Sequence, residues 1–366
     1  MSVQTTIPLS SPCLDDQDRA AVLDVLSSRT LSIGPVIAEF ERELAKAAGR
    51  RHAVAVSSGT AALHLIVRAL GWGHGDEVVT TPFSFVASTN CLLYEGAVPV
   101  FCDVDPATFN VDPKSVKAKL TKKTKALMPV HLFGQLARME AVNDLAKSHD
   151  TPVIEDAAQA IGATRNGKKA CAHGFAGCLS FYPTKNLGAF GDAGAICTND
   201  DHFAEVCRKL RVHGSGHTYH HEMIGGMFRI AALQAAVLDV KLKYLDKWNK
   251  ERAANAAIYN KAFAGTKVTA PPIEAGNESI YNQYVVRVPN RDAVKKRLAE
   301  RGIGTAIYYP IPLHLQECFK YLGHKEGDFP ESERACREVL ALPVYPELAK
   351  EQVEYVAKEL LAAVGT

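Results

Sequence analysis

Two segments about thirty residues apart have the residue types for one piece of chemistry. The apolar run 153–155 ends in a carboxylate, Asp156, and the apolar run 178–181 is followed by a lysine, Lys185, in a Gly-rich turn. A lysine can form a Schiff base with the aldehyde of pyridoxal phosphate (PLP), and a carboxylate can keep the ring nitrogen protonated so that the ring accepts electrons. The pair predicts a PLP site with Lys185 as its catalytic residue.

Short apolar runs alternate with helical patterns between residues 50 and 245, which predicts a doubly wound, mostly parallel α/β sheet. Ligands of such sheets bind beyond the carboxyl ends of the strands, where Asp156 and Lys185 both fall. We expect strands at His52–Val56, Glu77–Thr80, Val98–Cys102, Ala126–Val130, Val153–Glu155, Cys178–Phe181 and Ala195–Cys197, and helices at Ala61–Leu70, Ser88–Glu95, Pro113–Lys119, Arg138–Lys147 and His202–Arg211.

The length of 366 residues predicts two domains. Apolar residues of 231–249 fall near one helical stripe, so one long helix is expected there, leading into a smaller C-terminal α/β domain. We expect residues 1–248 to form an N-terminal arm and the large PLP domain, and residues 249–366 to form the small domain. The latter has a strand pattern at 284–288 and helical patterns at 292–301 and 350–364.

Composition excludes several classes of protein. The net charge of +2 gives no electrostatic case for nucleic acid or a membrane surface. No apolar stretch is long enough to span a bilayer, and the polar N-terminus does not resemble a signal peptide. Nine scattered cysteines suit free thiols in a reducing cytoplasm.

The segment Ser57-Ser58-Gly59-Thr60 lies between an apolar strand and a helix. The free N–H groups at a helix N-terminus can bind phosphate, but the same residues also form an ordinary N-cap. Both interpretations remain open from this motif alone.

Asp156 likewise has two interpretations, as a partner of the pyridinium or as the N-cap of a helix at 157–160. Such a helix would place Gln159 on the same face, where it could contact the ring hydroxyl of PLP. Phe83 and Phe85 alternate along an extended segment, so one is expected in the core and the other on the cofactor ring.

Apolar neighbours of Lys185 predict partial burial and a lowered pKa. No metal site is expected. Cys171, His173 and Cys178 lack a second ligand pair at zinc-like spacing. The histidines within 212–226 are interpreted as polar contacts of a flexible loop to substrate or a neighbouring subunit, although a metal site there stays an alternative.

Together these motifs resemble the DegT family of sugar aminotransferases, PLP enzymes of fold type I. The resemblance covers nearly the whole chain, and several motifs match in order and spacing. They are Ser57–Ala61, Gly75–Val78, Thr81–Phe83 with Phe85, Glu155–Gln159, Ser180–Gly188, Arg229 with Leu233–Ala236, and Tyr309–His314.

The resemblance implies a role for each matching residue. Lys185 would form the Schiff base, Asp156 would pair with the pyridine nitrogen, and Gln159 would contact the ring oxygen. Phe85 would stack on the ring, while three further residues would hold the phosphate: Gly59, Thr60 and Ser180. Four residues would line the substrate site: Arg229, Tyr308, Tyr309 and His314.

The resemblance also implies a reaction. An amino acid, expected to be glutamate, would give its amino group to a nucleotide-linked keto sugar, with a 3-keto sugar favoured over a 4-keto sugar. The family works as a homodimer with shared active sites, so the loop 212–229 is expected to reach the partner's cofactor.

The sequence departs from the family pattern in one segment. The family usually has Asn two residues before Arg229 and an acidic residue two positions after it, where this chain has Met227 and Ala231. A thioether cannot donate a hydrogen bond to phosphate, so Arg229 or a histidine of the loop would have to compensate.

Three other functions remain as alternatives. A PLP-dependent sugar dehydratase shares the fold but carries histidine where this chain has Lys185. A non-catalytic regulatory member of the fold is supported only by Met227 and Ala231. A Rossmann oxidoreductase would need a Gly-x-Gly-x-x-Gly turn, which residues 57–60 do not provide.

Overall fold

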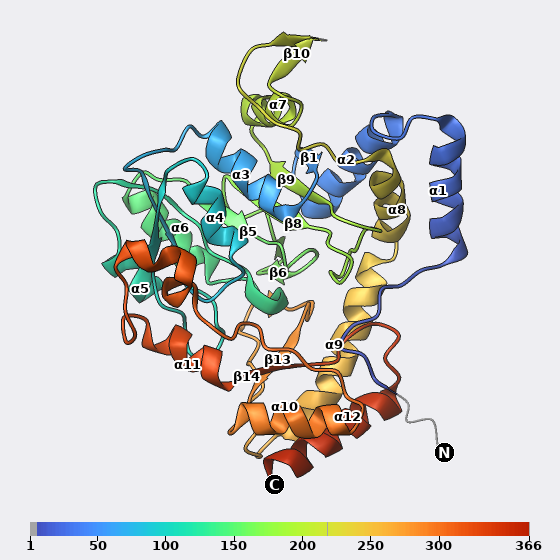
Figure 1. The fold of residues 1–366 in the computed structure, drawn as a ribbon, viewed down its shortest axis with the longest axis vertical. Helices are drawn as coiled ribbons and strands as arrows, with labels where there is room; N and C mark the ends of the chain where they lie inside the picture. The colour runs from blue at the N-terminus through green and yellow to red at the C-terminus, as the bar shows by residue number, and fades with distance from the viewer. Residues whose placement is uncertain (1–5, 218, 366) are drawn as a thin grey trace.

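The computed structural model describes residues 6–217 and 219–365, which form a large α/β body above a C-terminal layer (Figure 1). Two hydrogen-bonded strand groups, β3-β2-β4 and β5-β8-β9-β1, build the central sheet. Parallel bridges Leu127↔Val153 and Val130↔Asp156 join the two groups. The strands are β1 (His52–Val56), β2 (Glu77–Thr80), β3 (Val98–Phe101), β4 (Thr124–Leu127), β5 (Ile154–Asp156), β8 (Ala176–Ser180) and β9 (Gly194–Thr198).

The strand directions confirm the prediction of a mostly parallel sheet. β2 runs parallel to β3 and β4, and β5 runs parallel to β8. The exception is β9, which runs antiparallel to both of its neighbours, β1 and β8. This reversal follows from the connection 181–193, which leaves the end of β8 and returns at the same edge of the sheet.

Alternate residues of β1 pack into two different hydrophobic clusters. Ala53 and Ala55 pack on the side that includes α2 and α8, whereas Val54 and Val56 pack on the side that includes α3, α4 and α7. Both faces of the sheet are therefore covered, as its apolar strands predict. The helices of this body are α1 (Asp16–Ser28), α2 (Pro35–Ala48), α3 (Gly59–Ala69), α4 (Ala87–Leu93), α5 (Pro113–Ala118), η1 (Leu132–Gly134), α6 (Met139–Ser148), α7 (Asp201–Leu210) and α8 (Ala232–Leu242).

The expectation of one long helix over 231–249 is wrong. Helix α8 ends at Leu242, and α9 (Leu245–Phe263) begins three residues later. No Gly or Pro marks this break in the sequence. Leu238 and Leu245 both pack into the same core cluster on either side of it, so tertiary packing rather than a local signal sets the change of direction.

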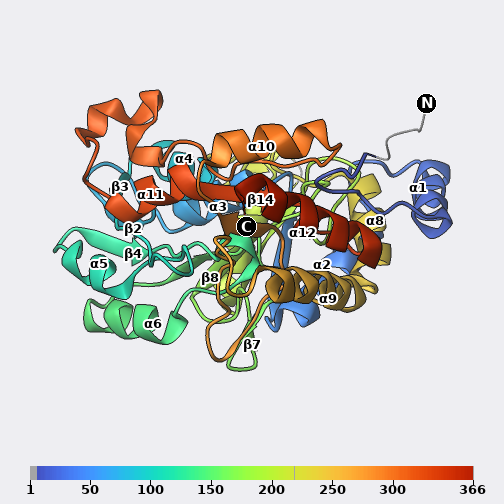
Figure 2. The same ribbon diagram turned by 90° about the horizontal axis from the view of Figure 1, so that it is seen from below.

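The C-terminal layer lies below the large sheet in Figure 1 and faces the viewer in Figure 2. Its core joins α9 to a two-stranded antiparallel sheet and two helices, and Ile7 near the N-terminus also packs there. A division at residue 248 stays a prediction, since α9 crosses that position. The elements are β13 (Tyr284–Arg287), β14 (Val339–Leu342), α10 (Arg291–Glu300), α11 (Pro330–Glu338), α12 (Lys350–Val364), η2 (Leu313–Leu315) and η3 (Glu317–Leu322).

A short antiparallel ribbon, β10 (Ser215–His217) with β11 (His220–His221), projects from the end of α7 (Figure 1). We call residues 212–229 the arm. A separate small sheet is formed by β6 (Thr164–Arg165), β7 (Lys168–Lys169) and β12 (Asn277–Glu278). Among the described residues, no helix combines the length and the apolar character needed to cross a bilayer.

Candidate active site

Three strand termini lie in one row at the edge of the sheet. Gly194, the first residue of β9, pairs with Val56 at the end of β1 and with Ser180 at the end of β8. Asp156 ends the next strand, β5, and pairs with Cys178. The structure therefore brings the N-terminus of α3, the lysine loop 181–193 and Asp156 to one edge, as the α/β pattern predicts.

The N-terminus of α3 meets the end of β8 at very close range. A Cβ atom on Gly59 would lie 2.8 Å from Cβ of Ser180, and one on Gly194 would lie 2.4 Å from the carbonyl carbon of Ser58. Ser58 is the N-cap, and its hydroxyl accepts a hydrogen bond of 3.0 Å from the N–H of Ala61.

The two interpretations of this motif are compatible. The Ser58 cap satisfies one N–H of the first turn, and the N–H groups of Gly59 and Thr60 have no acceptor within the helix. They lie next to the hydroxyl-bearing end of β8, which approaches so closely that only a glycine fits at position 59. Free N–H groups at a helix N-terminus, beside a serine hydroxyl, are groups that can bind a phosphate monoester.

Asp156 is buried and is held from several sides. Its Oδ2 accepts a hydrogen bond of 2.6 Å from Ser88, whose Oγ lies 2.9 Å from Oγ of Ser84. Its Oδ1 accepts from the N–H of Ala158 at 3.2 Å and from Sγ of Cys178 at 3.4 Å. These contacts fix the direction of the carboxylate. No local pattern indicates this role for Ser88, which reaches Asp156 from a helix 68 residues earlier in the chain.

Lys185 is half-buried in the loop that follows β8. Desolvation by burial lowers the pKa of its ammonium from 10.5 to about 8, although the negative charge of Asp156 and the nearby Cys178 act in the opposite direction. The predicted burial and pKa shift are confirmed. A substantial share of the amine is therefore unprotonated at mildly alkaline pH, as a nucleophile requires.

Gln159 lies on a turn, so the alternative of a helix at 157–160 is wrong. Its Oε1 accepts a hydrogen bond of 2.7 Å from the N–H of Phe133, and its Nε2 donates one of 3.0 Å to the hydroxyl of Tyr309. The turn still brings Gln159 to the edge that carries Asp156, because both flank the same strand end. Burial raises the pKa of Tyr309, which therefore keeps its proton.

The structure separates the two phenylalanines that the sequence could not tell apart. Phe83 is fully buried in a cluster with Phe109 and Phe133, whereas the side chain of Phe85 is 56% exposed. The Phe85 ring lies 6.4 Å from the ring of Tyr309, centre to centre. Phe83 is thus the core residue, and the ring of Phe85 is free for a flat ligand.

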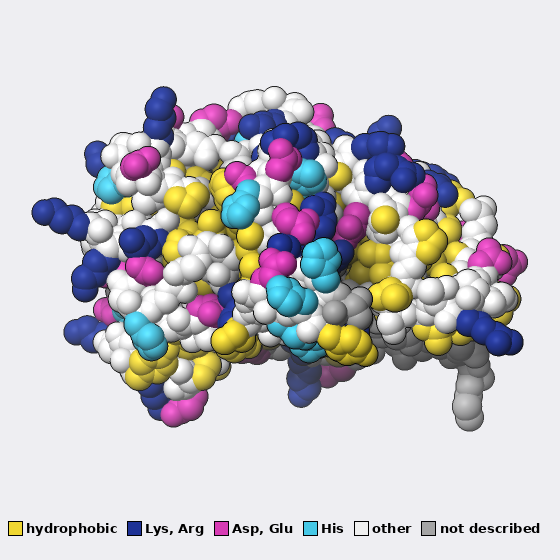
Figure 3. Space-filling model, turned by 90° about the horizontal axis from the view of Figure 1, so that it is seen from above, with side chains coloured by type: hydrophobic (Ala, Val, Ile, Leu, Met, Phe, Trp, Pro, Cys, Tyr) yellow, Lys and Arg dark blue, Asp and Glu magenta, His cyan; other side chains and the backbone are white. Residues whose placement is uncertain are grey.

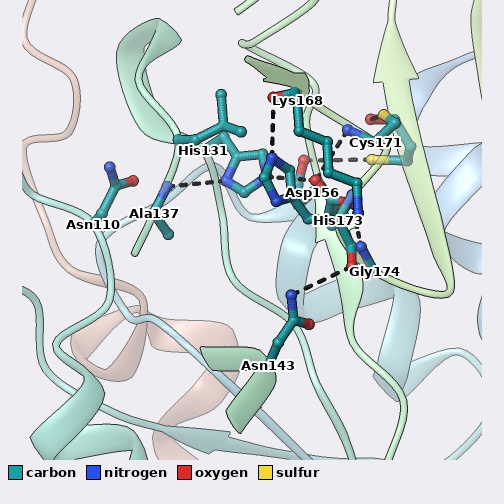
Figure 4. A network of polar contacts seen from close by, with 12 residues as sticks. Asn110, His131, Ala137, Asn143, Asp156, Lys168, Cys171, His173 and Gly174 are labelled. Atoms are coloured by element: carbon teal, nitrogen blue, oxygen red, sulfur yellow. Dashed lines mark hydrogen bonds and ion pairs between the residues drawn. The ribbon is translucent and has the colours of Figure 1, made fainter. Parts of the chain in front are cut away.

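Glu155, the neighbour of Asp156, points to the opposite side of the strand and anchors it. This fully buried carboxylate accepts hydrogen bonds from the backbone N–H groups of Cys171, His173 and Gly174 at 2.6–3.0 Å. It also accepts one of 2.9 Å from Nε2 of His131, whose Nδ1 accepts from the N–H of Ala137 (Figure 4).

These bonds to Glu155 change its ionisation. Burial alone would raise the pKa of Glu155, but the hydrogen bonds and the charge of His131 outweigh burial and lower it. A carboxylate that stays charged and fully bonded inside the protein rigidifies the strand that carries Asp156. The partners of Glu155 lie at distant positions of the chain, so no local sequence pattern indicates this role.

The expected substrate residues occupy different surroundings. Tyr308 and Tyr309 are half-buried at the edge of the site, next to Gln159. His314 is 1% exposed, and its Nε2 lies 3.1 Å from Oε1 of Glu333. The side chain of His314 is therefore engaged inside the protein, beside Phe329.

The arm places the backbone of Arg229 next to the end of β1, just before the N-terminus of α3. The backbone of Arg229 forms an antiparallel β-bridge with Val56. The N–H of Ser57 donates a hydrogen bond of 2.8 Å to the carbonyl oxygen of Phe228. Met227 pairs with Val212 and is 57% exposed. Arg229 also lines an open hollow on the arm with His217, Tyr219 and His221. Across the described part of the chain, no cluster of His, Cys, Asp and Glu is arranged to hold a metal ion.

The residues present fit PLP. The free N–H groups at the start of α3 suit its phosphate, the fixed carboxylate of Asp156 suits its ring nitrogen, and Lys185 has the lowered pKa that suits its aldehyde. The exposed Phe85 ring offers a face for stacking.

Comparison with known proteins agrees with this geometry. Residues 12–361 match the model of the DegT/DnrJ/EryC1/StrS aminotransferase family. A "pleiotropic regulatory protein" of Geobacillus stearothermophilus is 47% identical over 93% of this chain and 92% of its own length. A UDP-2-acetamido-2-deoxy-3-oxo-D-glucuronate aminotransferase of Pseudomonas aeruginosa is 38% identical over 95% of this chain and 96% of its own.

A solved structure of a related enzyme is also similar to this chain over nearly its full length. DesV of Streptomyces venezuelae, determined in complex with a ketimine intermediate, superimposes with a TM-score of 0.95 at 37% identity, over 99% of both chains. The fold is therefore that of fold type I sugar aminotransferases. The chain belongs to the DegT/DnrJ/EryC1/StrS family and is a PLP-dependent aminotransferase.

Proposed function

We propose that this enzyme transfers an amino group from glutamate to the 3-keto carbon of a nucleotide-linked sugar, in the biosynthesis of an amino sugar. The main support is the relative in Pseudomonas aeruginosa, named for a UDP-linked 3-oxo sugar acid and alike over nearly the full length of both chains. The 4-keto sugars are the second class of acceptor to test.

Each residue of the site has a proposed role. Gly59, Thr60 and Ser180 hold the phosphate, Phe85 stacks on the ring, and Gln159 contacts the ring oxygen. Asp156 holds the proton on the ring nitrogen. When bound, PLP supplies an electron sink for the bond that breaks at Cα of the amino acid.

Lys185 is the proposed acid and base. Its Nζ would take the proton from Cα of the bound amino acid and hold it until it is returned later in the transfer. A pKa of about 8 lets the same amine act in both directions near neutral pH.

The acceptor sugar is proposed to lie against Tyr308, Tyr309 and Arg229. The hydroxyl of Tyr309 accepts from Gln159, so its own proton can be donated to a ligand. Because His314 is engaged with Glu333, its contribution is to hold the 308–314 segment in place rather than to touch the sugar.

We also propose a homodimer in which the arm completes the partner's site. The face seen in Figure 3 carries histidines among hydrophobic side chains. The arm and α1 also carry exposed apolar residues, including Leu23, Leu26, Tyr219, Ile224 and Met227. Nine free cysteines support a reducing compartment such as the cytoplasm.

The test is the absorbance spectrum of the PLP-loaded protein before and after glutamate is added without sugar. Conversion of the lysine-bound band to the pyridoxamine band, followed by turnover with a 3-keto but not a 4-keto nucleotide sugar, is the expected result. A band that glutamate leaves unchanged contradicts the donor and favours the dehydratase alternative. If no band forms, the non-catalytic alternative gains, and Met227→Asn should then restore cofactor binding.

A further inference from the structure

Three buried asparagines meet directly behind Lys185. Nδ2 of Asn186 donates hydrogen bonds to Oδ1 of Asn249 at 2.7 Å and to the carbonyl oxygen of Ile280 at 2.9 Å. Nδ2 of Asn282 donates 2.9 Å to Oδ1 of Asn186. The three side chains are 4–9% exposed.

These asparagines come from three different parts of the chain. Asn186 follows the lysine in the loop 181–193, Asn249 lies in the first turns of α9, and Asn282 precedes β13 in the C-terminal layer. Nδ2 of Asn249 also donates a hydrogen bond of 3.3 Å to the carbonyl oxygen of Ile161, which lies at the end of the turn that carries Gln159.

The same C-terminal segment reaches Gln159 by a second route. The N–H of Ile280 donates a hydrogen bond of 3.1 Å to the carbonyl oxygen of Gly134. The N–H of Gln283 lies 3.5 Å from the carbonyl oxygen of Phe133. The N–H of Phe133 is in turn bonded to Oε1 of Gln159. Residues 280–283 therefore support both the lysine loop and the turn of Gln159.

Stability alone does not account for this choice of residue. Oδ1 of Asn282 is buried and has no hydrogen-bond partner among the described residues. A buried unsatisfied acceptor is unfavourable, and an apolar side chain would avoid it. Among the described residues, the side-chain amide of Asn282 makes one hydrogen bond, to Asn186 next to the lysine.

We propose that Asn186, Asn249 and Asn282 form a positioning latch, through which segment 280–283 fixes where the lysine loop holds Nζ of Lys185 relative to Asp156 and Gln159. The latch touches no reacting atom. It acts by keeping the backbone at 185–186 in place, so that the lysine stays in its desolvated position.

The charged groups around the lysine define what a loosened latch would do. Asp156 and Cys178 both favour its protonated form, while desolvation disfavours it. Lys185 and Asn186 line a pocket behind the loop. Three further charged residues line the same pocket: Lys241, Arg252 and Glu347. If the loop loosens, water reaches Nζ and the main cause of the lowered pKa weakens, so the pKa rises.

The test measures the acylation rate of Lys185 by acetic anhydride against pH, in the full-length protein without PLP, with mass spectrometry to identify the peptide. Asn282→Ala is expected to raise the pKa of Lys185 by at least about half a unit. The PLP-loaded variant should show a shifted pH midpoint of visible absorbance and a lower kcat with a smaller change in KM.

Asn255→Ala is the matched control. Asn255 is buried on the same helix and donates to the carbonyl oxygens of Tyr345 and Leu348, away from the lysine loop. It should lower the melting temperature without moving either pH midpoint. Asn249→Ala opens the latch from its other side and decides the matter if Asn282→Ala does not fold. The proposal is overturned if the Asn249 or Asn282 variant merely lowers the melting temperature, as the control does.

Discussion

The hydroxyl of Ser88 lies 2.6 Å from Oδ2 of Asp156 and donates a hydrogen bond to it. The bond joins α4 to the end of β5 and fixes the rotation of a carboxylate whose other oxygen is held by Ala158 and Cys178. A carboxylate fixed in this way loses little freedom when a ligand binds, which is an advantage in affinity.

Replacing Ser88 by alanine should therefore weaken PLP binding. A hydrogen bond to a charged group contributes roughly 1.5 kcal/mol, which corresponds to about a tenfold increase in Kd. Titration of the cofactor-free protein with PLP, followed by absorbance, measures the change.

Thr89→Val is the control for Ser88. Thr89 is the next residue of the same helix, fully buried, and its Oγ1 has no partner among the described residues. This variant should leave the Kd unchanged. Equal losses in both variants would show that repacking of α4, and not the bond to Asp156, causes the effect.

Gly59→Ala should displace the N-terminus of α3, the proposed phosphate site. The added methyl group would meet Cβ of Ser180 at 2.8 Å, so α3 must move away from β8. Overpacking of this kind costs about 1–3 kcal/mol of stability. PLP and inorganic phosphate should both bind more weakly, as isothermal titration calorimetry can measure.

Gly73→Ala provides the comparison for Gly59. A Cβ there would have its nearest contact at 3.4 Å, with the carbonyl oxygen of Glu95, and the site is remote from the sheet edge. Phosphate affinity should stay at the level of the unmodified protein. Normal phosphate binding by Gly59→Ala would rule out the N-terminus of α3 as the phosphate site.

Lys185→Met should stabilise the cofactor-free protein in a pH-dependent way. The folded protein lowers the pKa of Lys185 from 10.5 to about 8, so the unfolded chain binds more protons between these values. Below about pH 8 the lysine is charged in both states, and its burial opposes folding in full. This penalty fades as the pH rises from 8 to 10.5.

The stability gained by Lys185→Met should be about 1–3 kcal/mol near pH 7, less than the whole pKa shift would give because the side chain is partly exposed. It should shrink towards pH 10.5 in urea unfolding experiments. Lys250→Met, at an exposed lysine of α9, should show no such trend. A gain that is constant with pH would disprove the lowered pKa.

Two substitutions of Gln159 should have different effects. Gln159→Ala leaves the buried N–H of Phe133 without its acceptor, which should cost about 1–3 kcal/mol of stability. Gln159→Glu keeps that acceptor but removes the donor to Tyr309. The glutamate variant should therefore melt near the normal temperature and still lose kcat, and equal melting temperatures for both variants would contradict the assignment of this bond.

The sequence could predict the parts of the site that depend on strand ends. Asp156, Ser180 and the start of α3 were predictable because parallel strands deliver their carboxyl ends to one edge. The residues that hold them were not predictable. Ser88, His131 and Asn282 reach the site from positions tens of residues away, and a polar residue on a helix or turn has the same local pattern whether it faces solvent or a partner.

The break between α8 and α9 and the reversed direction of β9 could not be predicted from the sequence, for a related reason. Apolar periodicity reports which side of an element is buried, and it is silent on the direction in which the element runs. Both features are set by packing against distant parts of the chain.

The reversal of β9 has a consequence for the nucleophile. Ser180 and Gly194, which flank the lysine loop, are paired neighbours in the sheet, so the two ends of the loop are held side by side. The loop 181–193 therefore loses conformational freedom when the sheet forms, before any ligand binds. Folding itself therefore restricts where Lys185 can lie, because β9, the strand that closes the loop, is held between β1 and β8.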